Sequence, residues 1–188
     1  MRQLQILASL IFMVVLLSPA QAKDDYSETI GIYKSSATVN PYFSNSYGYA
    51  VFPSIGKGAV GIGGAYGKGQ VYQGGNMTGY TSMKQLTIGF QLGGQAYSEI
   101  IFFQNKAAYD KFTTGEFEFG AQATAVAITA GATAQAGTTG ASASANVGKS
   151  AGAQETRYQD GMAIFTHVKG GLMYEASIGG QKFRFKPR

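Results

Sequence analysis

The chain has 188 residues, with 15 Lys and Arg against 10 Asp and Glu, and a formal net charge of +5. It contains no cysteine, which excludes disulfide bonds and thiolate metal sites. Charged residues make up only 13% of the chain, whereas Gly (27), Tyr (12) and Phe (12) are abundant. This composition indicates a β-rich protein rather than a helical or disordered one.

The first 22 residues have the pattern of a secretory signal peptide. Arg2 gives a positive start, residues 4–17 form an apolar run, and Ala20-Gln21-Ala22 has the small-x-small pattern that precedes a cleavage site. An N-terminal membrane anchor is the alternative, but a full membrane span needs about 20 apolar residues. We therefore expect cleavage after Ala22, a single domain over residues 23–188, and a periplasmic or secreted protein.

Two short helices are expected before the first strand. Asp25 and Glu28 form a capping-box pair at the start of a helix over residues 25–37. Pro41 stands at the first position of a second helix that begins at Asn40, where proline is favourable because its missing N–H has no partner to lose.

The stretch over residues 47–72 contains a literal G-x-G-x-x-G at Gly56, Gly58 and Gly61. A dinucleotide-binding turn must open a helix, but each further glycine here would cost a helix roughly 1 kcal/mol relative to alanine. The carboxylate that would hold the ribose about 20 residues later is also missing, since residues 29–98 contain no Asp or Glu. A nucleotide is therefore not expected as a ligand.

The same stretch fits a strand better. One side would carry Val60, Ile62 and Tyr66, and the other side only alanine and glycine. A glycine-faced strand lets another backbone, a helix or a ligand come close. The alternative is a bulged, sharply curved strand with no ligand.

Further elements follow in chain order. Leu86, Ile88, Phe90 and Leu92 alternate with polar residues or glycine and predict a half-buried strand with these four side chains on its apolar side. Asn105 caps a short helix that ends at Gly115. Other strands are expected over residues 96–103, 117–127, 162–168, 172–178 and 182–186.

Residues 131–154 are a low-complexity segment of Ala, Gly, Ser and Thr, which we interpret as a mobile loop or an irregular strand extension. The pattern as a whole predicts an α+β fold. We expect an antiparallel, strongly twisted sheet or partial β-barrel with small N-terminal helices and one short inserted helix.

Residues that could carry chemistry are few. His167 is the single histidine, and it lies within an apolar strand pattern where a structural role is more common. Glu99 and Glu175 also lie in apolar strands and could form an acid/base pair, or each could satisfy buried polar groups. The His, Asp and Glu residues show no metal-ligand spacing. We expect neither an enzyme, nor a cofactor, nor a metal site.

Positive charge is concentrated in two parts of the chain. The carboxylate-free residues 29–98 contain four lysines, and the last seven residues contain four bases. Such uncompensated charge favours an anionic partner such as a phosphate-bearing lipid surface, although it is also found as ordinary solubility charge.

Four sequence blocks resemble the SYLF lipid-binding domain family, in its bacterial secreted branch. They are YGYAVFPSIGKGAVGIGGAYGKGQVY, IGFQLGGQAYSEIIFF, FEFGAQATAVAITAGA and GLMYEASIGGQKFRFKP, in that order along the chain. The resemblance implies a non-catalytic, phospholipid-binding module. Eukaryotic relatives bind phosphoinositides with the help of a basic amphipathic helix, and some act with actin regulators. Here the helix over residues 25–37 is not a basic membrane-binding helix. A bacterial envelope protein would also lie outside any actin-containing compartment, so neither actin binding nor phosphoinositide specificity is carried over.

The leading hypothesis is a lipid-binding protein of the bacterial envelope, with anionic phospholipid or a related amphiphile as its partner and no nucleic acid. The candidate headgroup-binding residues are Lys57, Lys68, Lys182, Arg184 and Lys186. The candidates for an apolar pocket, for which plain core is the alternative, are Ile62, Tyr66, Phe90 and Phe102. A structural or interaction protein without a lipid is the second hypothesis. An outer-membrane barrel is the third, and it is weakened by the basic last strand.

Overall fold

The structure is a computed structural model that describes residues 26–60, 62–88, 95–121, 123, 125–128, 158–170 and 178–188. Several predictions lie outside these residues and stay predictions. They are the signal peptide (1–22), the low-complexity segment (131–154), the second arm of the expected hairpin (172–177), Phe90 and Glu175. The backbone of Ile62 is described, but its side chain is not.

The three predicted helices are present. They are α2 (Tyr26–Ser35), α3 (Asn40–Asn45) and α4 (Lys106–Thr113). Asp25, the predicted cap of the first, lies outside the described residues, and the N-cap of the second is Val39, without a side-chain capping hydrogen bond. Pro41 lies in the first turn of α3. The side-chain oxygen of Asn105 accepts a hydrogen bond of 3.0 Å from the backbone N–H of Ala108 at the start of α4. Gly115, with φ +124°, lets the chain turn away after α4.

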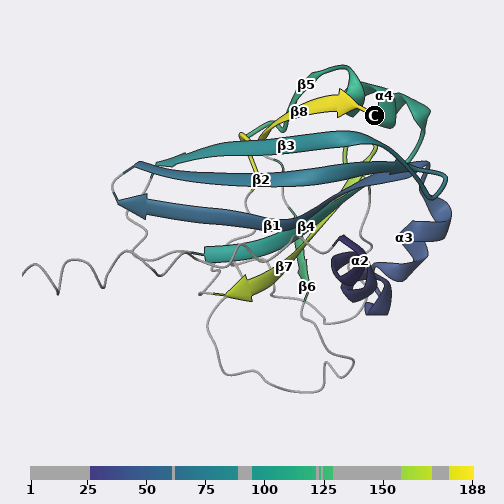
Figure 1. Cartoon of the computed structure of the whole chain (residues 1–188), viewed down its shortest axis with the longest axis horizontal. Coiled ribbons are helices and arrows are strands. Elements are labelled where there is room, and N and C mark those ends of the chain that lie inside the picture. The colour runs from purple at the N-terminus through teal and green to yellow at the C-terminus, as the bar shows by residue number, and fades with distance from the viewer. Residues whose placement is uncertain are drawn as a thin grey trace, which may run out of the picture.

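Eight strands form one open, twisted sheet (Figure 1). They are β1 (Gly48–Val60), β2 (Ile62–Gln73), β3 (Asn76–Ile88), β4 (Gln95–Phe103), β5 (Glu116–Glu118), β6 (Val126–Ile128), β7 (Met162–Gly170) and β8 (Lys182–Pro187). Their order across the sheet is β5-β8-β3-β2-β1-β4-β7-β6, and among these strands only the β6–β7 pair is parallel. The predicted α+β fold with a twisted sheet is confirmed; the sheet is open rather than a closed barrel.

The single strand expected over residues 117–127 is wrong. The structure has two short strands there, β5 and β6, at opposite edges of the sheet. Between them the N–H of Ala123 donates to the carbonyl oxygen of Gly120 over 3.0 Å, which closes a turn. A run of alternating small residues buries little surface on either face, so it does not hold the chain in one strand register.

Each face of the sheet carries its own core cluster. On one face Phe52, Ile101 and Phe183 pack with α4, which contributes Ala108 and Phe112. The opposite face is covered by α2 and α3. This second cluster rests on β1, β4 and β7 and consists of Tyr33, Val39, Val51, Ile100, Phe102, Ala163 and Phe165. The helices cover only part of this face, and the remaining part lies over β2, β3 and β8 (Figure 1).

The glycine-faced side of β2 is turned towards the first core cluster. A Cβ atom at Gly67 would lie 2.6 Å from Cγ1 of Ile55, and one at Gly69 would lie 2.7 Å from Cδ1 of Phe52. The β1–β2 register also shifts between Val51 and Ser54, as in a β-bulge. The close approach that these glycines permit is therefore made by core side chains of the neighbouring, bulged strand, and no ligand is needed to explain them.

Candidate functional site

The described part of the chain exposes three large apolar side chains, all on neighbouring strands. Tyr66 on β2 is 47% exposed, Tyr80 on β3 is 51% exposed and Leu86 on β3 is 83% exposed. Tyr66 lies on the same side of β2 as Tyr72, which packs against the cluster under α2 and α3. The three side chains therefore share the helix-bearing face of the sheet, in the part that the helices leave uncovered.

Basic side chains lie between these apolar ones. The register aligns Tyr66 of β2 with Lys84 of β3, and Lys84 with Lys182 of β8. Side chains opposite one another on one face of adjacent strands are about 4.5–5.5 Å apart at Cβ, so they are direct neighbours. We call this surface the basic–aromatic face, and it consists of Tyr66, Lys68, Tyr80, Ser82, Lys84, Leu86, Lys182, Arg184 and Lys186.

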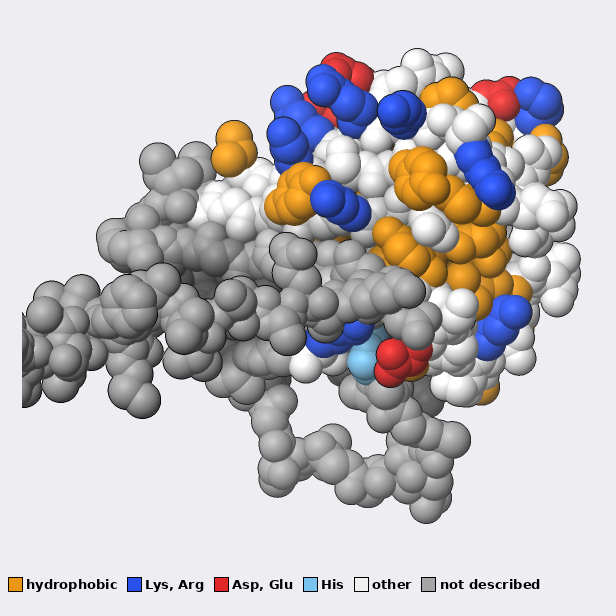
Figure 2. All heavy atoms as spheres, in the orientation of Figure 1, with side chains coloured by type: hydrophobic (Ala, Val, Ile, Leu, Met, Phe, Trp, Pro, Cys, Tyr) orange, Lys and Arg blue, Asp and Glu red, His pale blue; other side chains and the backbone are white. Residues whose placement is uncertain are grey.

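The charges of the face are displayed in Figure 2. Lys and Arg side chains gather over the region of β3 and β8, with hydrophobic side chains between them and acidic ones near its margin. A surface that interleaves cations with exposed aromatic and aliphatic side chains suits a partner that offers negative charge above an apolar layer.

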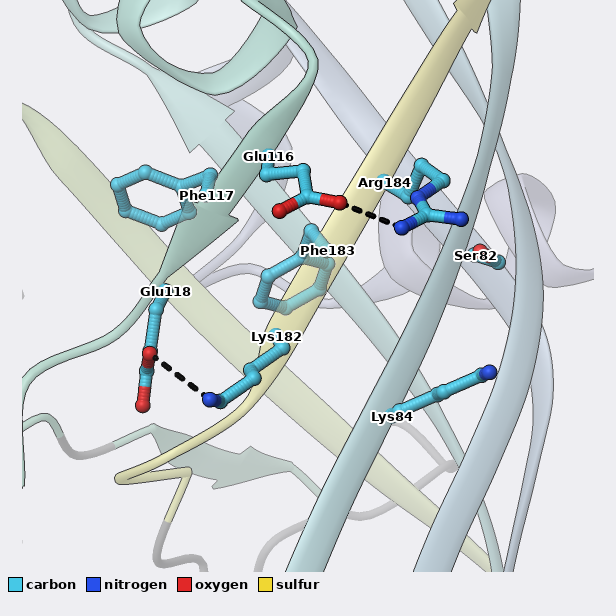
Figure 3. Close-up of a pocket in the computed structure, with 8 residues that line it drawn as sticks. All are labelled: Ser82, Lys84, Glu116, Phe117, Glu118, Lys182, Phe183 and Arg184. Atoms are coloured by element: carbon cyan, nitrogen blue, oxygen red, sulfur yellow. Dashed lines mark hydrogen bonds and ion pairs between the residues drawn. The ribbon is translucent and has the colours of Figure 1, made fainter.

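Two of the cations on the face are compensated by the edge strand β5. Lys182 Nζ lies 3.4 Å from Glu118 Oε2, and an Arg184 guanidinium N–H donates to Glu116 Oε1 (Figure 3). Both ion pairs are exposed and so contribute little to stability, on the order of 0–1 kcal/mol each. The positive charge available to a partner comes instead from other lysines of the face. Lys68, Lys84 and Lys186 form no ion pair with any carboxylate of the described ranges.

A shallow hollow lies beside these ion pairs, between β3 and the β5–β8 pair. Its volume is about 430 Å³, and it is lined by Ser82, Lys84, Glu116, Phe117, Glu118, Lys182, Phe183 and Arg184. Figure 3 shows that the Lys84 side chain points away from both ion pairs. The aromatic rings of Phe117 and Phe183 belong to the core cluster below, so the hollow is a dip in the basic–aromatic face rather than an enclosed ligand cavity.

The structure brings together four of the five predicted headgroup-binding residues. Lys68, Lys182, Arg184 and Lys186 lie on the basic–aromatic face. Lys57 does not, because it pairs in register with Ala65, whose side chain is buried on the opposite side of the sheet. Lys84 was not among the predicted residues, although it lies near the centre of the face.

The predicted apolar contacts do not form a common pocket in the described part of the structure. Phe102 is fully buried and its ring centroid lies 4.9 Å from that of Phe43 and 5.4 Å from that of Tyr42, so it is core. Tyr66 is exposed on the basic–aromatic face. The side chain of Ile62 and the whole of Phe90 lie outside the described residues.

The strand predicted around Leu86 has the opposite orientation to the one expected. Gln85 is 5% exposed and donates through Nε2 to the carbonyl oxygen of Gly179 over 3.0 Å, whereas Leu86 is 83% exposed. The buried Met83 on the same uninterrupted strand fixes the alternation, so odd-numbered residues point inward. The local sequence pattern alone does not indicate that Leu86 is exposed.

Glu99 and His167 lie on opposite faces of the sheet and do not form an acid/base pair. In the β4–β7 register Glu99 is opposite Thr166, and His167 is opposite Ser98. Glu99 is fully buried, and burial raises its pKa from its ordinary value of 4.5 to about 7. Desolvation, followed by the charge of Lys169, lowers the pKa of His167. Glu99 and His167 are therefore too far apart across the sheet to act as a pair in acid/base chemistry.

The described ranges contain no group of three or more His, Cys, Asp or Glu residues that could hold a metal ion. None of their helices combines the length and the apolar composition that a transmembrane helix requires.

Comparisons with known proteins identify the family of the chain. A family model described as "Las17-binding protein actin regulator" (Ysc84) matches residues 84–186, which include part of β3 and all but the last residue of β8. The chain is also 29% identical over 157 residues to the Beta cell expansion factor A of Aeromonas veronii. That alignment covers 82% of this chain and 51% of the relative, so the chain spans about half the length of that protein.

Proposed function

The chain belongs to the Ysc84/SYLF family, a family of binding domains, and from this premise we propose a non-catalytic membrane-contact function for it. In this proposal the basic–aromatic face lies against the surface of an anionic phospholipid bilayer. The predicted signal peptide would place that contact in the bacterial envelope.

The observation that carries the proposal is the uncovered half of one sheet face. Three lysines there, Lys68, Lys84 and Lys186, have no carboxylate partner among the described residues. A lysine near an anionic membrane surface contributes about 1 kcal/mol of binding free energy. Because the three ammonium groups are held on one rigid sheet, they can contact several headgroup phosphates at the same time.

The exposed apolar side chains give the second contribution. Tyrosine is favourable at the headgroup level of a membrane because its ring is apolar and its hydroxyl remains in contact with water. Tyr66 and Tyr80 flank Lys84 and Lys186 in the strand register, and Leu86 extends the apolar part of the face along β3. We expect these side chains to enter the headgroup layer while the lysines remain at the phosphates.

The family description favours a second candidate, because it names a protein partner and actin regulation. For this chain the corresponding hypothesis is a protein-binding role without a lipid. The same basic face would attract an acidic protein surface, so charge alone does not separate the two candidates.

Co-sedimentation with vesicles separates them. The chain is mixed with vesicles of neutral phosphatidylcholine, or with vesicles that also contain phosphatidylglycerol, at low and at high salt. We expect binding only to the anionic vesicles, weakened by salt. A Lys68→Glu/Lys84→Glu variant should bind at least tenfold more weakly, because two charges near the surface contribute about 2 kcal/mol.

The matched control is Lys106→Glu/Lys111→Glu, which reverses the same number of charges on α4, on the other face of the sheet. It should bind like the unmodified chain. A folded chain that binds neither kind of vesicle would overturn the lipid proposal and leave the protein-binding candidate. Equal weakening by both double variants would show that net charge acts rather than this face.

A further inference from the structure

A group of buried polar atoms lies inside the core cluster, on the side of the sheet opposite the basic–aromatic face. Glu99 of β4 and Gln181, which directly precedes β8, are both completely buried. Gln181 Nε2 donates to Glu99 Oε2 over 3.1 Å and to the Tyr97 hydroxyl oxygen over 3.3 Å. Three further atoms have no hydrogen-bond partner: Glu99 Oε1, Gln181 Oε1 and Thr166 Oγ1. A buried polar atom without a hydrogen-bond partner destabilises the folded state, so three such atoms in one place require an explanation.

Gln181 connects this buried group to the chain that enters β8. Its backbone N–H donates to the carbonyl oxygen of Ile178 over 3.1 Å, which closes a turn with Gly180 at φ +75°. Its carbonyl oxygen accepts from the N–H of Phe119 over 3.0 Å. The side chain of Gln181 therefore joins the centre of the sheet at β4 to the turn before β8, across 82 positions of sequence.

We propose that Glu99 is a proton-operated latch on the Gln181 turn, which holds β8 in place when the carboxyl is protonated and releases it when the carboxyl is ionised. This inference rests on the proposed function only where it concerns membrane binding, because β8 carries three cations of the basic–aromatic face. The latch itself is a property of the chain without any lipid.

The surroundings of Glu99 make its neutral form the stable one in the closed core. Phe52 of β1 and Thr166 of β7 are its register neighbours, and neither carries a charge. On its own side of the sheet, Glu99 is faced by the titratable group of Tyr97, on the same strand. Tyr33 of α2 lies on the opposite face, where its hydroxyl is 3.2 Å from Ser98 Oγ. Burial, with a smaller contribution from Glu99, raises the pKa of both tyrosines. No described cation is near enough to compensate an ionised Glu99. The hydrogen bond that Gln181 donates to Glu99 lowers the pKa, but burial raises the pKa by more.

The turn before β8 is the part of this environment that can open most easily. Phe52 and Thr166, the register neighbours of Glu99, lie within strands β1 and β7, whereas Gln181 lies in a turn. The strand that follows this turn, β8, is separated from the sheet edge only by the three-residue strand β5. A surface hollow lined by Phe119, Gly120, Gly179 and Gly180 lies over the turn. Movement of the turn would admit water to an ionised Glu99 and remove most of its desolvation cost.

The sign of the pH dependence follows from the direction of the pKa shift. Burial raises the pKa of Glu99 from 4.5 to about 7, so the closed turn retains a proton that the open turn releases. Opening therefore becomes easier as the pH rises from about 4.5 to about 7, by at most about tenfold per pH unit, and then stays constant.

Hydrogen exchange of the lipid-free chain tests the latch. The exchange rates of the β8 amides are measured by mass spectrometry from pH 5 to 8 for the unmodified chain and for Glu99→Gln. At each pH the rate of the unmodified chain is divided by the rate of Glu99→Gln, which cancels the intrinsic pH dependence of exchange. We expect this ratio to rise several-fold or more between pH 5 and 7 in β8, while the ratio for β1 changes less. His167→Gln, which removes the single histidine of the chain, should retain the unmodified pattern.

The latch is overturned if the ratio is independent of pH, or if all strands change together, which would indicate global destabilisation. Should Glu99→Gln not fold, the carboxyl carbon of Glu99 in ¹³C-glutamate-labelled unmodified chain is titrated by NMR. A midpoint near 4.5 would then refute the inference, and one well above 4.5 would support it.

Vesicle co-sedimentation at pH 5 and 7.5 then addresses regulation. Binding that weakens at pH 7.5 in the unmodified chain but not in Glu99→Gln is the expected result. If β8 exchange responds to pH while no vesicle is bound at either pH, the latch stands and the proposed membrane function fails. If vesicles are bound equally at both pH values, regulation of binding by the latch is refuted.

Discussion

The two halves of one sheet face show how the same strand periodicity gives either a core or a binding surface. Over β1, β4 and β7 the outward side chains are apolar, and α2 and α3 cover them. Over β2, β3 and β8 the outward side chains are lysine, arginine, tyrosine and leucine, and no described helix covers them. Both halves belong to the same sheet. They differ in that the side chains of one half pack against helices, whereas those of the other half remain exposed.

On this face, stability and the proposed binding function depend on different side chains. Burial of large apolar side chains under the helices stabilises the fold, by roughly 1.5–3 kcal/mol for each such side chain. The exposed half adds little to stability, because its ion pairs are solvated and its apolar groups remain in water. Substitutions on the two halves should therefore affect different measurements.

The largest effect is expected in the covered half. Phe102→Ala removes a fully buried ring that packs against Tyr42, Phe43, Tyr49 and Phe165. The free energy of unfolding should fall by about 3–5 kcal/mol, as is typical of a buried Phe replaced by Ala. Denaturant unfolding measures this change. Tyr66→Ala on the uncovered half should change it by less than about 0.5 kcal/mol; similar losses for both variants would contradict the division of the face.

The next effect concerns the core directly beneath the sheet. Glu99 keeps its proton in the folded state between its ordinary pKa of 4.5 and its raised value of about 7. The contribution of Glu99 to the free energy of unfolding should therefore be fully present below pH 4.5 and should fall by roughly 3 kcal/mol as the pH rises to 7. The free energy of unfolding of Glu99→Gln, measured by thermal or denaturant unfolding, should not show this decrease with pH. Parallel stability curves for the two chains would show that Glu99 titrates normally.

A smaller effect is expected for the apolar side chains of the uncovered half. Leu86→Gln should leave the free energy of unfolding nearly unchanged, because Leu86 is already 83% exposed. Binding to anionic vesicles should weaken by about 1–2 kcal/mol, since one leucine no longer enters the headgroup layer. The loss should persist at high salt, where the lysine contribution is screened. A loss that disappears at high salt would argue against insertion of Leu86.

The smallest effect is expected for the ion pairs of β5. Glu116→Gln removes the partner of Arg184 at an exposed position, so the free energy of unfolding should fall by no more than about 1 kcal/mol. Vesicle binding should become slightly tighter, because Arg184 then lacks a competing carboxylate. Weaker vesicle binding in Glu116→Gln would mean that Glu116 positions the arginine for its partner.

Local sequence signals predicted the elements that local chemistry determines. Pro41, Asn105 and Gly115 marked helix boundaries because capping and backbone conformation depend on neighbouring residues. The bases of the last strand were placed on one side of it because alternation in a strand is strict, and Phe183 is indeed buried on the other side. The family resemblance added the expectation of a binding domain.

The arrangement of the site depended on strand register, which the sequence does not display. Lys84 becomes part of the face only because β3 lies between β2 and β8. The ion pairs of Arg184 and Lys182 join residues more than sixty positions apart, and Lys57 is excluded by its pairing with Ala65. The link between Glu99 and Gln181 is likewise a tertiary contact, so no spacing in the sequence could indicate it.

The most direct test of the central claim uses the absence of tryptophan from the chain. A single Leu86→Trp variant carries its fluorophore on the basic–aromatic face, and Ala107→Trp carries it at an exposed position of α4, on the other face. With anionic vesicles that contain brominated lipids, the fluorescence at position 86 should shift to the blue and be quenched, while that at position 107 should not change. Quenching at position 107 but not at position 86 in vesicle-bound protein would contradict the assignment of this face to the membrane.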